Sequence, residues 1–140
     1  LEKGGDVLGV IPEFLATREV MHTGVSELKI VPSMHIRKAW MAEESDAFLA
    51  LPGGYGTLEE LFEVITWSQL GLHRKPIGVL NTAGFFTPLL EFVDRAIREG
   101  FIRDNERRHL IVGEDPDLLL NAIEASCRPE SLSEVMIEKT

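Results

Sequence analysis

The chain has 140 residues, 44% of them hydrophobic and 26% charged, which is the composition of one globular domain of ordinary size. Its formal net charge of −9 excludes a broad nucleic-acid groove, because such a groove needs clustered cations to displace counterions. A small anion held in a local positive pocket is still compatible with this charge.

The single cysteine, Cys127, excludes a disulfide framework within the chain and favours a reducing, cytoplasmic compartment. We expect the Cys127 thiol to be inert. No apolar run approaches the ~20 residues of a spanning helix and no signal peptide opens the chain, so we expect no membrane partner.

The first residues, Leu1 to Gly5, resemble the C-terminal end of a helix with its glycine stop, and no initiating Met precedes them. We therefore expect the chain to be the C-terminal part of a larger domain, with an upstream strand and loop missing. Residues 1–126 are expected to form this part of a single domain, and residues 127–140 a flexible tail.

In chain order, short apolar runs predict strands and amphipathic runs predict helices. The first part contains strands over 6–11, 28–31 and 46–51, a loop over 13–25, and a helix from the N-cap Ser33 to about residue 45.

The second part contains a helix over 57–72, whose last turn Gly71 loosens, and a strand over 76–80. A second helix runs from the cap Thr87 to about Arg98, with Pro88 in its first turn and Gly100 as its stop. A strand over 110–112 and a helix from Asp115 to about Ser126 follow.

This alternation of strands and helices, with no hairpin signal between them, predicts an α/β fold with a parallel sheet and helices on both of its faces. In such sheets ligands bind beyond the carboxyl ends of the strands. The glycine-rich segment that follows the strand over 46–51 lies in that place.

Three glycines in four residues, Gly53, Gly54 and Gly56, connect this strand to a helix that is expected to begin at Thr57. Unpaired N–H groups and the helix dipole favour an anion at such a helix start, so the segment predicts a phosphate nest with the Thr57 hydroxyl as an added donor. It has neither the lysine of a Walker A loop nor the dinucleotide glycine spacing. The alternative is an unoccupied tight turn capped by Thr57.

Glu60 lies one turn inside this helix, and a carboxylate beside an anion site suggests chemistry. As a catalytic group it would stabilise positive charge that develops on a substrate and orient water. The alternative is an ordinary acidic residue favoured by the helix dipole. Arg37 and Lys38, on the preceding helix, are expected to face the same sheet edge, where Arg37 would orient the Glu60 carboxylate. The alternative is that Arg37 and Lys38 are a solvated basic pair that offsets the charges of Glu43 and Glu44.

These residues resemble the LOG (Lonely Guy) family of cytokinin riboside 5′-monophosphate phosphoribohydrolases, which are sometimes mislabelled lysine decarboxylases. The resemblance runs from about Val7 to Ala125 and rests mainly on Met34-His35-x-Arg37-Lys38 and on the run from Pro52 to Glu60. It implies a Rossmann-like fold, a homodimer or an assembly of dimers, and hydrolysis of the N-glycosidic bond of AMP or N6-substituted AMP, with no metal or other cofactor.

Carried over residue by residue, the resemblance implies Arg37 and Glu60 as the catalytic pair. It implies as substrate-binding positions Glu19, Lys38, Gly53, Gly54, Tyr55, Gly56, Thr57, Leu58, Glu59 and Thr66. The family also has an upstream Gly-Gly-Gly-x-x-Gly segment that lines the nucleotide site, and this sequence starts after the position of that segment.

A non-catalytic nucleotide or molybdenum-cofactor carrier of the same fold is the alternative function. The pairing of Arg37 with Glu60 argues against it, since a pure phosphate binder gains nothing from a carboxylate. The four histidines lack metal-ligand spacing, and no arrangement for pyridoxal phosphate is present, which argues against lysine decarboxylation. Trp67, on a similar side of its helix to Glu60, would stack on a base or contact a dimer partner; core packing is the commoner fate of a helical Trp.

Overall fold

The computed structural model describes residues 1–16, 24–104 and 110–127. The chain divides into two compact units, Leu1–Ser45 and Asp46–Thr140, and each is described here by itself. That residues 1–126 form one domain stays a prediction. Residues 128–140, which make up most of the predicted tail, lie outside the described part of the chain.

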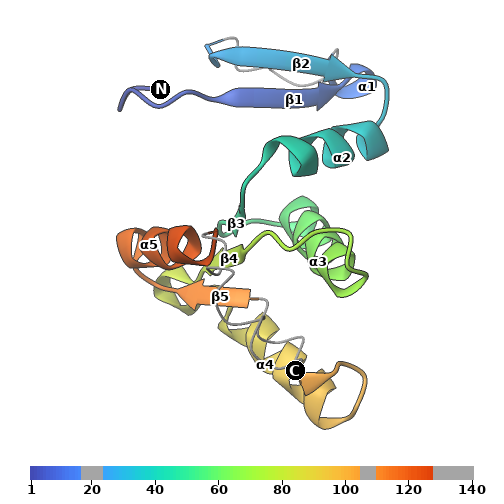
Figure 1. Cartoon of the computed structure of the whole chain (residues 1–140), viewed down its shortest axis with the longest axis vertical. Helices are drawn as coiled ribbons and strands as arrows, with labels where there is room; N and C mark the ends of the chain where they lie inside the picture. The colour runs from blue at the N-terminus through green and yellow to red at the C-terminus, as the bar shows by residue number, and fades with distance from the viewer. Residues whose placement is uncertain (17–23, 105–109, 128–140) are drawn as a thin grey trace, which may run out of the picture. The chain divides into compact units, whose positions relative to one another are not determined.

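The first unit is a pair of parallel strands with a helix packed on it (Figure 1). Its elements are β1 (Leu8–Pro12), α1 (Glu13–Ala16), β2 (Glu27–Val31) and α2 (Met34–Glu44). The loop predicted over 13–25 is wrong for residues 13–16, because they form α1, and one helical turn is too short to show a period. Residues 17–23 lie outside the described residues.

The start of α2 is the one predicted. Ser33 has an extended backbone, and its hydroxyl accepts a hydrogen bond from the Ile36 N–H at 3.3 Å, which is the geometry of an N-cap. Further along the helix, Trp40 lies under the ammonium of Lys29 from β2, with 4.6 Å between Nζ and the ring centroid. This cation–π contact ties α2 to the strand pair.

The second unit is a three-stranded parallel sheet in the order β3-β4-β5, with helices between its strands (Figure 1). Its elements are β3 (Phe48–Ala50), α3 (Tyr55–Gln69), β4 (Ile77–Leu80), the short 3-10 helix η1 (Thr82–Gly84), α4 (Thr87–Arg98), β5 (Leu110–Gly113) and α5 (Pro116–Cys127).

The central strand β4 shows how the helices are distributed over the sheet. Ile77 and Val79 are fully buried in the core with Leu61 of α3 and with Phe86, just before α4. Gly78 faces the other way, because a Cβ on it would collide with Ile123 of α5. Helices therefore cover both faces of this sheet, and the predicted α/β, Rossmann-like class is confirmed.

The C-terminal end of α3 differs from its sequence prediction. The helix expected to run to residue 72 ends at Gln69, because Gly71 adopts a φ of 74° and stops it. The Gly71 N–H donates to the Ser68 carbonyl and the Leu72 N–H to the Trp67 carbonyl, which is the Schellman pattern.

The second correction concerns the start of α4. Thr87 is not its cap, since the N-cap position is Phe86. The side chain of Asn81, which precedes the helix, accepts a hydrogen bond from the N-cap residue instead. The buried Asn81 side chain accepts from the Phe86 N–H at 2.7 Å and donates to the Thr87 hydroxyl at 3.1 Å. The predicted stop at Gly100 is confirmed by a second Schellman pattern, with a φ of 83°. Among the described residues, no helix has the length and apolarity to cross a membrane.

Candidate functional site

The glycine-rich segment after β3 leads directly into the first turn of α3, which contains Gly56. The prediction that this helix begins at Thr57, with a Thr57 cap, is wrong: α3 begins at Tyr55, its N-cap is Gly54, and no side chain caps it. Its first described intrahelical bond runs from the Leu58 N–H to the Gly54 carbonyl at 3.1 Å. The N–H groups of the first turn consequently have no acceptor within the helix and point along its axis.

The three glycines of this segment differ in what surrounds them. A Cβ on Gly53 would collide with the hydroxyl of Thr57, so Gly53 is required by packing. Around Gly54 and Gly56 a Cβ would meet no described heavy atom within 4 Å, and neither has a positive φ. Neither packing nor backbone conformation therefore requires a glycine at 54 or 56. What remains is an accessible backbone at a helix start, which is what a phosphate needs.

Glu60 lies in the second turn of α3, directly behind this helix start. It is half-buried, whereas its neighbour Glu59 is exposed and Tyr55 is 93% exposed. With 3.6 residues per turn, Gly56, Glu60, Glu63 and Trp67 follow one stripe of the helix. The predicted catalytic carboxylate thus shares a helix face with one of the two open glycines.

Arg37 lies in the first unit, on α2, where groups of its own unit hold the guanidinium. Its Nε donates to the carbonyl of Val10 in β1 at 3.0 Å, and its Nη1 donates to the thioether sulfur of Met34 at 3.6 Å. Sequence reasoning did not identify Val10 or Met34 as partners, although the i,i+3 spacing of Met34 and Arg37 places both on one side of the helix. Lys38 follows and is half-buried.

The remaining predicted positions are scattered. Glu19 lies outside the described residues. Arg37 and Lys38 belong to the first unit and Glu60 to the second, so their meeting stays a prediction. Thr66 lies six residues beyond Glu60 on α3, where its hydroxyl donates to the Phe62 carbonyl at 2.7 Å.

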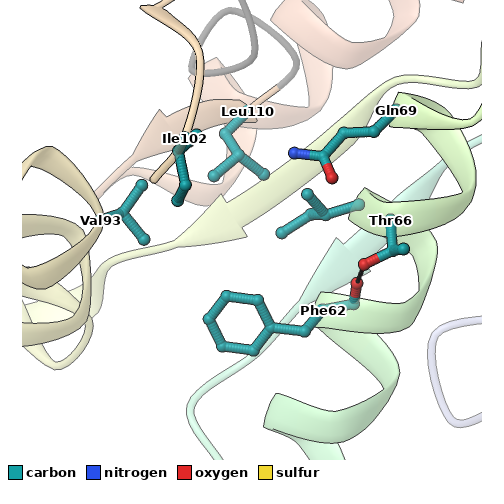
Figure 2. Close-up of a pocket in the computed structure, with 7 residues that line it drawn as sticks. Phe62, Thr66, Gln69, Val93, Ile102 and Leu110 are labelled. Atoms are coloured by element: carbon teal, nitrogen blue, oxygen red, sulfur yellow. Dashed lines mark hydrogen bonds between the residues drawn. The ribbon is translucent and has the colours of Figure 1, made fainter. Parts of the chain in front are cut away.

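Thr66 also lines a pocket of about 150 Å³ between α3, α4 and β5, drawn in Figure 2. The walls are mostly apolar and comprise Phe62, Ile65, Thr66, Gln69, Val93, Ile102 and Leu110. Gln69 ends α3 and Leu110 begins β5, so this pocket lies at the opposite end of the parallel sheet from the glycine segment. Within the second unit Thr66 thus lies toward the other end of α3 from the helix start, and its part in substrate binding stays a prediction.

In the described part of the chain, no three His, Cys, Asp or Glu side chains are grouped so as to hold a metal ion. His73 has a structural setting, since its Nε2 is 2.8 Å from the Val64 carbonyl and its Nδ1 accepts from the Lys75 N–H at 3.1 Å. These two contacts join the end of α3 to the approach to β4.

Comparison with known proteins gives one matching family, described as "possible lysine decarboxylase", over residues 1–123. Among curated proteins, the probable cytokinin riboside 5′-monophosphate phosphoribohydrolase LOGL2 of Oryza sativa subsp. japonica is 54% identical over 121 residues, which cover 86% of this chain and 50% of the relative. From Arabidopsis thaliana, the cytokinin riboside 5′-monophosphate phosphoribohydrolase LOG7 is 53% identical over 121 residues (86% and 56%) and LOG1 is 59% identical over 109 residues (78% and 51%). The chain spans about half the length of these relatives.

Proposed function

The chain belongs to the LOG family, whose profile is described as "possible lysine decarboxylase", and on that premise we propose that it carries the hydrolytic site of a nucleoside 5′-monophosphate phosphoribohydrolase. The proposed substrates are AMP and N6-substituted AMP. The products are ribose 5-phosphate and the free base, adenine or a cytokinin. The names of the relatives support hydrolysis of this bond in preference to decarboxylation of an amino acid.

The observation that carries the proposal is the difference among the three glycines. Gly54 and Gly56 leave the first turn of α3 uncovered although a side chain would fit there. A 5′-phosphate placed at this helix start would accept hydrogen bonds from first-turn N–H groups and gain from the helix dipole. In this proposal the resulting binding energy, remote from the bond that breaks, positions the ribose.

The proposed reaction breaks the bond between the anomeric carbon and the purine nitrogen. The bonding electrons leave with the base, which takes up a proton from solvent, and positive charge develops on the ribose as in glycoside hydrolysis. The proton that Glu60 removes from water in the next step returns to solvent, so the protons balance. The Glu60 carboxylate stabilises that charge and takes a proton from the attacking water, whose oxygen bonds to the anomeric carbon. Arg37 steers Glu60, and Lys38 adds positive charge for the substrate.

We further propose a homodimer, or an assembly of dimers, in the cytoplasm. The resemblance of the motifs to the LOG family supports the assembly. The several large apolar side chains exposed on the second unit, among them Phe92 at 65% and Phe101 at 84%, are consistent with a covered surface. The single cysteine supports a reducing compartment.

The test is incubation of the natural full-length protein with AMP and with N6-isopentenyl-AMP, followed by chromatography for the free base. Release of base, with an equal amount of ribose 5-phosphate, is the expected result. Intact nucleotide that nevertheless binds in calorimetry would replace the proposal with the carrier alternative. Neither binding nor release would refute both.

A further inference from the structure

The stripe of α3 that carries Glu60 continues to a large aromatic side chain. Trp67 lies seven residues beyond Glu60, so the two side chains differ in direction by only ~20° and in height by ~10 Å. Trp67 is half-buried and is not a member of the core cluster around Ile77, Val79 and Phe86. Packing in that cluster, among the described residues, therefore does not account for it.

The position of Trp67 on the helix favours one direction for the indole. Long side chains on a helix lean toward its N-terminus and cover the surface of the preceding turn. From this tendency we expect the Trp67 ring to lean toward the turn that holds Glu63, and so toward Glu60. The Leu72 N–H, donating to the Trp67 carbonyl at 2.9 Å, fixes the backbone of this last turn.

A 5′-nucleotide presents its groups in a fixed order: phosphate, ribose, anomeric carbon, purine and, at its far end, the N6 substituent. The proposed function, on which this inference rests, places the phosphate at Gly54–Gly56 and the anomeric carbon at Glu60. Gly56 and Glu60 are separated by ~6 Å along the helix axis. A nucleotide lying in this direction carries its purine past Glu63 and its N6 substituent toward Trp67.

We propose that Trp67 contacts the N6 substituent and determines the preference between N6-substituted AMP and AMP itself. An indole face suits an apolar or unsaturated group, and an aromatic contact contributes beyond the area it buries. Because the N6 amino group of plain AMP carries no substituent, Trp67 affects the turnover of AMP little. Trp67 is thus a specificity-determining residue, and Glu60 acts on the bond that breaks.

The experiment compares kcat/KM for N6-isopentenyl-AMP and for AMP in the natural full-length protein and in its Trp67→Ala variant. The expected result is a fall of about tenfold in the ratio of the two values, with AMP turnover within about threefold of wild type, because an apolar contact of this size supports selectivity of that order. Trp67→Phe keeps an aromatic face and is expected to keep most of the preference.

Equal losses on both substrates, an unchanged ratio, or a wild-type protein with no preference would overturn the inference. If Trp67→Ala does not fold, Trp67→Leu keeps apolar bulk without the aromatic face, and a wild-type ratio in that variant overturns it too. Failure of the proposed function is recognised separately, as absence of base release by wild-type protein. In that case the ratio of the two dissociation constants, measured by calorimetry in the same variants, decides on Trp67.

Discussion

The starts of α2 and α3 solve the same physical problem in different ways. Both helices leave N–H groups without intrahelical partners, and α2 satisfies one of them with the Ser33 hydroxyl. At the start of α3 stands Gly54, without a side-chain cap and with open space around the glycines that no packing requires. The first start stabilises its own helix. The start of α3 leaves its first-turn N–H groups available to an acceptor outside the helix. This difference between the two helix starts is the reason for placing the proposed phosphate site at α3.

The strongest way to break this comparison is to remove the carboxylate behind the uncapped start. Glu60→Gln keeps the volume of the side chain but removes its charge, so turnover of AMP by the full-length protein should fall by about a thousandfold. The melting temperature should stay close to wild type, because Glu60 is only half-buried. Base release measured by chromatography gives the rate.

Glu91→Gln on α4 is the matched control, since Glu91 is exposed on another helix of the same unit. It should change neither rate nor stability. A Glu60→Gln protein that turns over AMP at the wild-type rate would remove Glu60 from the mechanism and leave the helix start as a binding site alone.

A somewhat smaller effect is expected from the capped helix, which carries Arg37. Arg37→Ala removes the guanidinium that Val10 and Met34 hold, and turnover should fall by about a hundredfold or more. Arg37→Lys should restore little, because an ammonium cannot reproduce the fork of donors. Steady-state kinetics measures both, and full activity in the lysine variant would contradict an orienting role.

Sequence reasoning predicted the capped start and misplaced the uncapped one, and the reason is physical. A serine before an amphipathic run announces a cap, because its hydroxyl has one favourable use there. A glycine N-cap has no side chain by which the sequence could indicate it. Thr57 is a preferred N-cap residue, so the sequence placed the start of the helix at the wrong residue. The four residues of α1 were missed because one turn has no periodicity.

The site was predictable to the extent that it is local. The segment from Gly53 to Glu60 is continuous, and its chemistry follows from residue types and their spacing. Contacts between distant segments, such as Arg37 with Val10, depend on how α2 packs on β1, and no local pattern encodes that packing. The sequence alone does not distinguish the role of Gly53 from that of Gly56. The difference, a collision for a Cβ at Gly53 and open space at Gly56, is known only from the atoms around them.

The two kinds of glycine give the next prediction, which sharpens the comparison most directly. Gly56→Ala should raise the free energy of unfolding by about 0.5–1 kcal/mol, since Ala suits a helix better and has room here. The same variant should raise KM for AMP about tenfold, because the new methyl group stands where the phosphate approaches. Gly53→Ala should lower the free energy of unfolding by about 1–3 kcal/mol, because its Cβ collides with Thr57.

Denaturant unfolding and steady-state kinetics on the same two proteins separate stability from binding. The expected pattern is a crossed one, in which the more stable variant binds the nucleotide less well. Were Gly56→Ala to leave KM unchanged, the open space at the start of α3 would have no part in binding phosphate.

The smallest effect is expected at the start of α2. Ser33→Ala removes the hydroxyl that accepts from the Ile36 N–H and should cost about 1 kcal/mol of stability, seen as a lower denaturant midpoint with an unchanged slope. KM for AMP should not change, because this helix start satisfies itself and is assigned no ligand. The reciprocal variant, Gly54→Ser, gives α3 the cap that α2 already has; it should stabilise the fold and weaken nucleotide binding. If Ser33→Ala instead weakened nucleotide binding as much as Gly54→Ser does, the start of α3 would not differ from the start of α2 in its role in binding.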